Sequence, residues 1–261
     1  MRAVDLIPIP DLDSAREVLC IQPHPDDLEI AAGAAIARLV RAGAHVTYVT
    51  VTDGGFGSPD PGMTRSKMAA IRRLEQQKAA SELGVTDLVW LNYPDAMPLP
   101  GLELRQRLIE LIQEKRPQAV LLPDPWLTYE AHPDHRAVGL AAAEAVIFSV
   151  FPAETKTGEK TNGFDLPMAA FYFTARPNTW LDVDATWDQK MAAIKAHESQ
   201  FPEHILGMFS FYFEAKAREN TEAARKAAAQ AGKPEPRMEK AEAFKVLTPT
   251  HLHANVDAET C

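Results

Sequence analysis

Two short segments concentrate the histidine and aspartate side chains that could do chemistry in this sequence. They are Pro23-His24-Pro25-Asp26-Asp27 and His132-Pro133-Asp134-His135, and each follows a run with the composition of a β-strand. Neutral imidazole nitrogens and a carboxylate are ligands that zinc accepts, and three of them leave a fourth position open, as catalytic zinc sites require. We therefore expect His24, Asp27 and His135 to hold one zinc ion per subunit. Such a ligand set also suits iron or cobalt, so the identity of the metal stays open.

The other polar side chains of these segments can act on a substrate bound beside the metal. Zinc lowers the pKa of a bound water molecule to about 7, and Asp26 can accept the proton of this water as a general base. We expect His132 to be an imidazolium that stabilises an oxyanion, and Asp134 to orient His132 and raise its pKa. Pro and Asp also favour ordinary turns. The presence of two such segments, each after a strand, favours a functional site rather than two unrelated turns.

Strands and helices that alternate along the first 150 residues can bring these segments together. Apolar and β-branched runs predict four strands, and amphipathic runs predict four helices between and after them. The strands are Val18–Gln22, His45–Thr52, Asp87–Asn92 and Gln118–Pro123, and the helices are Leu28–Ala42, Thr64–Leu83, Leu102–Lys115 and His135–Val150. The alternation indicates βαβ units around a parallel sheet. Ligands bind outside the carboxyl ends of such strands, so segments 111 residues apart (135 − 24) can form one site.

The rest of the chain is less regular and richer in helix. The predicted elements are a strand, a helix, a long helix and a polar surface loop, at Met168–Ala175, Thr186–Ser199, Glu203–Gln230 and Ala153–Gly163. We expect an α/β, Rossmann-like three-layer fold with a mainly parallel central sheet and a helical C-terminal part. One domain would span residues 1–261, with a core over 1–150 and an extension over 151–261 that completes the site.

Composition limits the kinds of partner and of site. The chain has 27 Lys and Arg against 36 Asp and Glu, a net charge of −9, which argues against nucleic acids and anionic membranes as partners. Cys20 lies in an apolar run and Cys261 is the last residue, so a cluster of thiolate ligands is excluded. No signal peptide is visible, and the longest nearly apolar stretch, Ala137–Phe151, is too short to span a bilayer. We expect a cytoplasmic protein.

The two histidine motifs on a Rossmann-like pattern resemble the LmbE/PIG-L superfamily of zinc-dependent N-deacetylases. Further blocks are similar to its diacetylchitobiose deacetylase branch: Ile21–Asp27, Asn92–Asp95, Asp124–His135, Ala196–Pro202, Ala241–Leu247 and Leu252–Ala254. The resemblance implies the same roles as the residues themselves suggest, with His24, Asp27 and His135 on zinc, Asp26 as base and His132 at the oxyanion. The implied reaction is hydrolysis of the N-acetyl group of an amino sugar, of N-acetylglucosamine or diacetylchitobiose type, to a free amine and acetate.

The resemblance also implies contacts outside the two motifs. An arginine at the position of Arg72 would reach sugar hydroxyls, although an exposed helix arginine is the alternative. Asp95 is a candidate acceptor for a sugar hydroxyl, or else a turn-capping aspartate. In the diacetylchitobiose branch a histidine matching His253 reaches the active site of a neighbouring subunit, which implies a homo-oligomer, a trimer or a hexamer. The family often carries a Glu in the loop after its second strand, and the run Thr52–Gly57 has none.

Several assignments stay open at this point. Trp126 and Tyr129 precede the second motif and could stack on a sugar ring or belong to the core. The remaining four histidines are expected to be structural. His45, His204 and His251 have no partner pattern, and no ligand role follows for His197. The alternative function is a metal-dependent amidase or hydratase of the same fold that acts on another small molecule. A binding protein with a degenerate site is disfavoured, because the set of candidate catalytic residues is complete.

Overall fold

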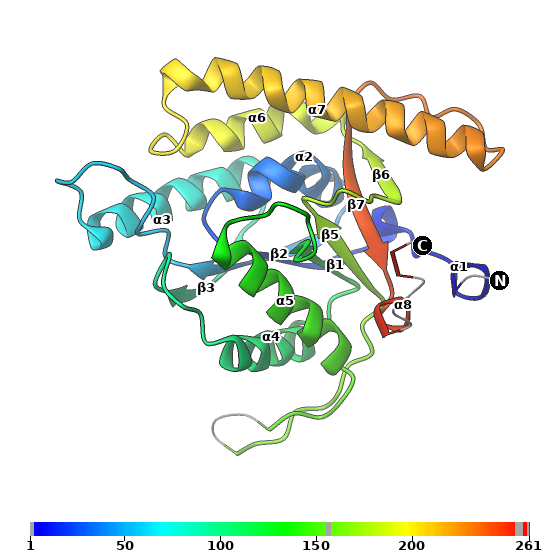
Figure 1. Ribbon diagram of the computed structural model, residues 1–261, viewed down its shortest axis with the longest axis horizontal. Helices are drawn as coiled ribbons and strands as arrows, with labels where there is room; N and C mark the ends of the chain where they lie inside the picture. The colour runs from blue at the N-terminus through cyan, green and yellow to red at the C-terminus, as the bar shows by residue number, and fades with distance from the viewer. Residues whose placement is uncertain (1–2, 155–157, 254–257, 260) are drawn as a thin grey trace.

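The central element is a mixed β-sheet. The computed structural model describes residues 3–154, 158–253, 258–259 and 261. Among them, seven strands lie in the order β3-β2-β1-β4-β5-β7-β6 (Figure 1). Their bounds are β1 Glu17–Gln22, β2 His45–Thr52, β3 Asp87–Tyr93, β4 Ala119–Pro123, β5 Met168–Tyr172, β6 Thr179–Asp182 and β7 Ala241–Leu247. Strands β1 to β5 are parallel, whereas β7 runs antiparallel to both β5 and β6.

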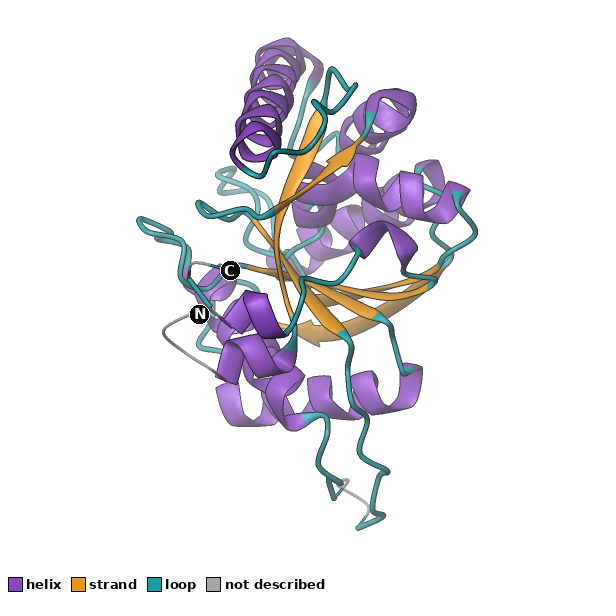
Figure 2. Cartoon of the chain, turned by 90° about the vertical axis from the view of Figure 1, so that its right-hand side faces the viewer, coloured by secondary structure: helices purple, strands orange, loops and turns teal. Residues whose placement is uncertain are grey.

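Helices cover both faces of this sheet and make three layers (Figure 2). One face carries α2 Asp27–Arg41, α3 Arg65–Glu82 and α6 Trp187–Ala196, with the long α7 Glu203–Gln230 beyond them. The other face carries α4 Gly101–Lys115, α5 Pro133–Phe148 and α8 Pro249–His253. The short helix α1 Ala3–Leu6 and the 3₁₀ turns Leu12–Ser14 and Asp184–Thr186 complete the described elements. The predicted Rossmann-like three-layer fold with a mainly parallel sheet and a helical C-terminal part is therefore confirmed.

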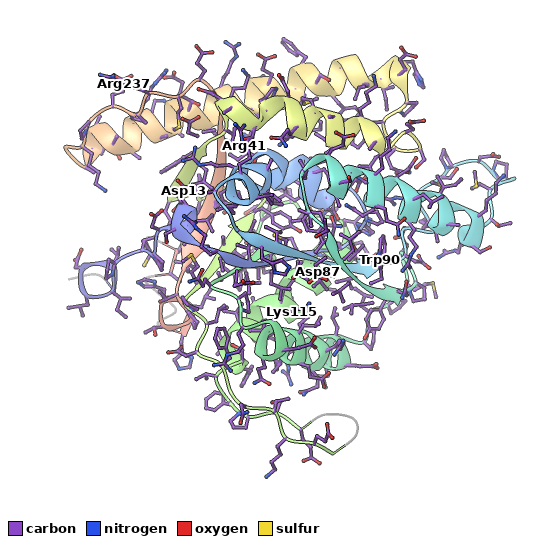
Figure 3. All side chains as sticks on the ribbon, turned by 180° about the vertical axis from the view of Figure 1, so that it is seen from behind. Asp13, Arg41, Asp87, Trp90, Lys115 and Arg237 are labelled. Atoms are coloured by element: carbon purple, nitrogen blue, oxygen red, sulfur yellow. The ribbon has the colours of Figure 1, made fainter. Side chains whose placement is uncertain are left out.

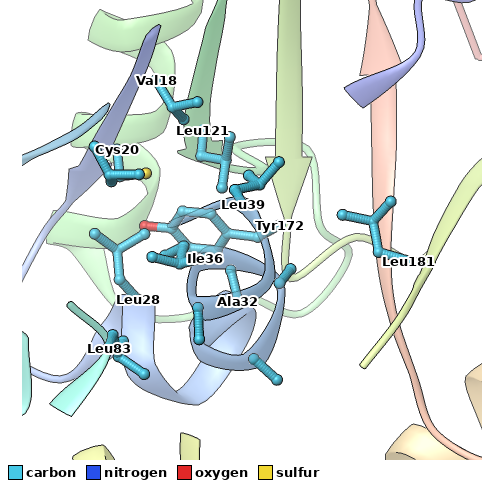
Figure 4. Close-up of a cluster of buried hydrophobic side chains, with 14 of the residues drawn as sticks. Val18, Cys20, Leu28, Ala32, Ile36, Leu39, Leu83, Leu121, Tyr172 and Leu181 are labelled. Atoms are coloured by element: carbon cyan, nitrogen blue, oxygen red, sulfur yellow. The ribbon is translucent and has the colours of Figure 1, made fainter. Parts of the chain in front are cut away.

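The apolar strand runs are explained by burial on both faces, as expected where helices cover a parallel sheet. Figure 4 shows part of this core, where Leu28, Ile36 and Leu39 of α2 face Cys20 and Tyr172 of the sheet. The Tyr172 hydroxyl donates to the carbonyl oxygen of Ile21 at 2.8 Å, so its one polar atom is paired. Burial raises the pKa of the Cys20 thiol, which agrees with its exclusion as a metal ligand.

The helix after β4 begins earlier than predicted. We expected it from His135, but α5 starts at Pro133, because proline is well suited to the first helical position and His132 caps the helix. Downstream, Phe173 takes a left-handed conformation (φ +53°) and β5 ends before it, three residues short of the predicted end. β6 and β7 were not predicted as strands.

Outside the core, paired side chains fix the ends of elements. In the rear view of Figure 3, Lys115 at the end of α4 lies beside Asp87 at the start of β3, and their Nζ and Oδ2 atoms are 2.8 Å apart. The predicted surface loop over residues 153–163 contains a bridge between Glu154 and Lys160, and its residues 155–157 lie outside the described part. Over the described part of the chain, no helix is long and apolar enough to cross a membrane.

Candidate active site

The two histidine segments meet at one point of the sheet edge. β1 and β4 are neighbours, and the strand order reverses between them. Such a reversal leaves a crevice outside the carboxyl ends of the two strands. The segment Pro23–Asp27 follows β1, and His132–His135 begins α5 after β4. The ring centroid of His24 lies 4.6 Å from that of His132 and 5.3 Å from that of His135.

The carboxylate of Asp27 lies between two histidine rings. Its Oδ2 is 3.2 Å from Nδ1 of His24, and its Oδ1 is 3.3 Å from Nε2 of His135. The backbone N–H of His24 also donates to Oδ2 at 2.8 Å, which fixes the rotation of the carboxylate. The structure therefore brings together the three residues that we expected to bind a metal, with one nitrogen of each ring turned toward the same carboxylate.

The other nitrogen of each ring faces a different carboxylate. Nε2 of His24 is 3.2 Å from Asp134 Oδ2 and 3.4 Å from Asp95 Oδ1, and Nδ1 of His135 is 3.0 Å from Glu130 Oε2. Histidines that bind metals usually donate their second N–H to a carboxylate in this way, which fixes the tautomer and the orientation of the ring. The site therefore fits a divalent cation, and the groups of described side chains close enough to share one ion are His24 with His132 and His135, and His24 with Asp95 and Asp134.

Charge in the site also suits a cation. Burial alone would lower the pKa of His24, but its contacts with Asp134 and Asp27 outweigh burial and raise the pKa well above its usual value. At His135, burial would also lower the pKa, but the Asp27 carboxylate outweighs burial and raises it. Burial would raise the pKa of Asp27, yet the two histidines hold it below its usual range. A divalent ion can replace the protons on these rings and pair with the carboxylate.

Asp26 sits beside this cluster with a different environment. It is the residue before the first turn of α2, in a left-handed conformation (φ +113°, ψ −25°), and its side chain makes no capping hydrogen bond. Its Oδ1 lies 3.2 Å from Nη2 of Arg72. Burial raises the pKa of Asp26 to about 6, against the opposing charge of Arg72. A carboxyl group that titrates near neutral pH is suited to proton transfer.

His132 and Asp134 differ from the prediction. The Asp134 carboxylate does not contact His132: its Oδ2 faces His24 and accepts the Ala96 N–H at 3.0 Å. The His132 ring instead caps α5, with Nδ1 accepting the backbone N–H of Asp134 at 3.3 Å. Burial, together with His24 and His135, lowers the pKa of His132. The expected carboxylate–imidazolium pair is therefore wrong, because the first turn of α5 aims the Asp134 side chain at the sheet edge.

Two of the three expected substrate contacts are engaged inside the protein. Arg72 is only 4% exposed, so the alternative of an exposed helix arginine is wrong. It donates to the carbonyl oxygens of Gly54 and Pro25 and pairs with Asp26. Asp95 is also 4% exposed and accepts the Phe56 N–H at 2.9 Å while facing His24. We expect these two side chains to position the site rather than to bind sugar hydroxyls.

The third expected contact lies elsewhere. His253 ends α8, which follows β7, and Leu247 at the end of β7 pairs with Ala169 near the start of β5. His253 is therefore exposed at the opposite edge of the sheet from the site of its own chain. Ala254, the last residue of that motif, lies outside the described residues. Trp126 and Tyr129 are 59% and 97% exposed, so the alternative that they belong to the core is wrong.

Comparison with known proteins identifies the family. Residues 19–146 match the family described as PIG-L, GlcNAc-PI de-N-acetylase. Over 204 residues, the chain is 38% identical to a diacetylchitobiose deacetylase of Thermococcus kodakarensis, with 77% of this chain and 76% of that protein covered. The chain belongs to the PIG-L family. The predicted resemblance is confirmed, and the names of these relatives support the predicted class of enzyme, a hydrolytic N-deacetylase.

Solved structures related to this PIG-L chain share its whole fold. The N,N′-diacetylchitobiose deacetylase of Pyrococcus horikoshii is 35% identical, with a TM-score of 0.81, and the match covers 92% of this chain and 86% of that one. A 4-carboxy-2-hydroxymuconate hydratase of Pseudomonas putida KT2440 is 25% identical, with a TM-score of 0.72, and the match covers 89% and 96%. The PIG-L fold thus occurs in proteins named for two different reactions.

Sequence reasoning missed several residues of this PIG-L site. Glu130 lies between the two motifs and contacts His135, and its nearness to that histidine in the sequence was an available signal. His197, expected to be structural, is fully buried, and its Nε2 lies 3.4 Å from Oε2 of Glu29, which is also fully buried. Gln76 accepts the N–H of Asp26. Of the other histidines, His251 is structural as expected, since its Nε2 forms a hydrogen bond with a backbone oxygen.

Proposed function

We propose that this chain hydrolyses the N-acetyl group of an amino sugar, of N-acetylglucosamine or diacetylchitobiose type, with one zinc ion per subunit. The observation that carries the proposal is the position of the Asp27 carboxylate between one nitrogen of His24 and one of His135, with further carboxylates on the outer nitrogens. The names of the most similar relatives supply the substrate class. We further propose that residues 1–261 act as one deacetylase unit.

The residues that would hold the ion are His24, Asp27 and His135. When bound there, zinc polarises a carbonyl group and lowers the pKa of a water molecule to about 7. Asp26 lies next to Asp27 in the chain but turns its carboxylate toward Arg72. In this proposal Asp26 acts on the substrate and not on the ion.

Asp26 moves the proton in both halves of the reaction. As a carboxylate it accepts a proton from the water that attacks the amide carbonyl, and a C–O bond forms. As a carboxylic acid it then delivers that proton to the amine nitrogen while the C–N bond breaks. The products are acetate and the free amine. Burial raises the pKa of this carboxyl group above its usual range in the metal-free protein, which favours a group that both takes up and releases a proton.

His132 is proposed to stabilise the oxyanion as a neutral ring. Its Nδ1 accepts the Asp134 N–H, so the proton of the neutral imidazole belongs on Nε2. An N–H at that position can donate to the oxygen that becomes negative during attack. This replaces the imidazolium expected from the sequence. The fixed position of the donor at the start of α5 reduces the reorganisation needed during the reaction.

Amine release is the direct test of this function. The purified protein is analysed for metal and incubated with N-acetylglucosamine and with diacetylchitobiose. We expect zinc at one ion per chain, release of primary amine, loss of activity with a chelator and recovery with added zinc. Absence of bound metal together with activity that a chelator leaves intact would contradict the proposal.

Oligomerisation and location stay predictions. His253 lies at the opposite edge of the sheet from the site of its own chain, so a role in catalysis requires a neighbouring subunit. We propose a trimer or hexamer in which His253 enters the neighbouring cleft, to be checked by light scattering and by mixing His253→Ala with Asp26→Asn subunits. Complementation between these two inactive variants is expected only if the residues act across subunits. The expected cytoplasmic location also stays a prediction.

A second candidate is a hydratase acting on a small organic acid. It is favoured by the similarity to the 4-carboxy-2-hydroxymuconate hydratase at 25% identity over nearly the whole chain. The same metal site would serve, because activation of water is common to both reactions. Zinc-loaded protein that releases no amine from any acetylated sugar, but hydrates the muconate, would favour this candidate.

A further inference from the structure

The peptide bond before Asp26 is held from both sides by helix α3. On one side, Nη2 of Arg72 donates to the carbonyl oxygen of Pro25 at 2.5 Å. On the other side, Oε1 of Gln76 accepts the N–H of Asp26 at 3.0 Å. Residues 72 and 76 are four apart, so they share one face of α3. Helix α3 therefore fixes, through these two hydrogen bonds, the peptide unit between Pro25 and Asp26, which sets the direction of the Asp26 side chain.

The conformation held in this way is an unfavourable one. Asp26 has φ +113° and ψ −25°, a strained region that a non-glycine residue keeps only where the surrounding structure holds it there. An aspartate before a helix normally caps it with its side chain, but Asp26 does not. Part of that role falls to Gln22, whose Oε1 accepts the N–H of Leu28 at 3.1 Å. The Asp26 carboxylate is thereby released from capping.

The orientation of Gln76 is itself determined. Its Oε1 also accepts from Nε2 of Gln22 at 2.9 Å, and its Nε2 donates to Oε1 of Glu29 at 2.9 Å. All three side chains are fully buried. Because an amide accepts at one end and donates at the other, the reversed amide would set a donor against the Asp26 N–H and an acceptor against Glu29. Only one orientation satisfies both neighbours.

We propose that Gln76 is a positioning residue, which holds the backbone of Asp26 so that the carboxylate points at the reacting groups. This inference deepens the proposed function and rests on Asp26 being the general base. Gln76 does not touch the substrate in this proposal, so its removal should act on turnover through Asp26 alone. A merely structural role would instead lower stability without depending on which residue occupies position 26.

A double-mutant cycle on turnover tests the proposal. Gln76→Met keeps the length of the side chain and removes the acceptor. We expect it to lower kcat at least tenfold, with KM and metal affinity changed less than twofold. In the Asp26→Asn background the same change should alter the residual kcat less than twofold, because effects of residues that act as one unit are not additive. Equal losses in both backgrounds would overturn the proposal.

The control variant is Gln113→Met on α4. Gln113 is also buried, at 6% exposed, and donates to the carbonyl oxygens of Ser149 and Phe151, on the other face of the sheet. It should lose stability without a loss of kcat. A tenfold loss of kcat in this control would mean that any buried glutamine gives the same effect, and that result would also overturn the proposal.

A measurement on the metal-free wild type needs neither activity nor a folded variant. Hydrogen exchange of the Asp26 amide should be strongly protected, since its acceptor is a buried side chain. Fast exchange at Asp26 while the neighbouring Ile30 amide stays protected would refute the contact with Gln76. If instead the wild type releases no amine but the Asp26 amide is protected, the proposed function fails and the contact survives, so the two failures are distinguishable.

Discussion

Replacing Asp26 with asparagine should make the metal-free protein more stable while it abolishes most turnover. Asn keeps an oxygen that can face Arg72 and removes the negative charge. The structure gives the reason, because Asp26 is only 9% exposed and burial raises its pKa from 3.8 to about 6 despite the nearby guanidinium. Ionising this group in the folded protein is therefore less favourable than ionising it in the unfolded chain.

The size and the pH dependence of this effect follow from linkage. Between pH 3.8 and about 6 the folded state binds more protons at Asp26 than the unfolded state does, so this group lowers stability as the pH rises through that window. One pKa unit corresponds to about 1.36 kcal/mol, so a shift of about two units costs about 3 kcal/mol at pH 8. The difference in the free energy of unfolding between Asp26→Asn and the wild type should approach this value at pH 8 and vanish near pH 4.

Urea unfolding in the presence of a chelator, at several pH values from 4.5 to 8, measures the difference. The same preparations, loaded with zinc, should show turnover reduced by about a hundredfold or more. Asp87→Asn is the matched control, because Lys115 and Thr47 outweigh burial and lower the pKa of Asp87, so this variant should lose stability at pH 8. A variant Asp26→Asn that is no more stable than the wild type at pH 8, or whose gain does not change with pH, would refute the reasoning.

Three further predictions follow from contacts of the same kind. Glu130→Gln should weaken zinc binding about 10- to 100-fold in a chelator competition, because the carboxylate that orients His135 is lost; unchanged affinity would show that the contact is incidental. Lys190→Met should destabilise the protein by about 3–5 kcal/mol in urea, since it leaves the buried Glu242 without its 2.5 Å partner, and a second change to Glu242→Gln should restore part of the loss. In the wild type, kcat/KM should rise with pH through a value at or below about 6 as Asp26 ionises, and a flat profile from pH 4.5 to 8 would contradict its role as base.

The meeting of the two histidine segments could be predicted because local and topological information agree. His24 and Asp27 come from one short segment, and His135 comes from a second segment that follows another strand. Parallel strands deliver such segments to the same edge of a sheet. The structure places Asp27 within 3.3 Å of both rings. Residue type and position relative to the strands were therefore sufficient to predict that these side chains lie together, and their role as metal ligands stays a proposal.

The choice of partner within the site could not be predicted. Asp134 was expected to contact His132, two residues away, but its carboxylate reaches His24, which is 110 residues distant. The first turn of α5 begins at Pro133, and this turn decides which way each side chain points. A start two residues later, as the sequence suggested, would have aimed Asp134 differently. An error of half a helical turn thus changes which groups touch, although it leaves the fold intact.

The residues that support the general base carry a weaker signal in the sequence, but a usable one. Arg72 and Gln76 occupy the buried stripe of α3 together with Met68, Ala79 and Ala80. A stripe with that spacing is normally apolar, and a buried polar group without a partner costs about 1–3 kcal/mol. Polar residues on such a stripe therefore imply partners from elsewhere in the chain. Here those partners are the carboxylate and the backbone of Asp26, so the residues that break the apolar pattern of α3 are the ones that hold the base.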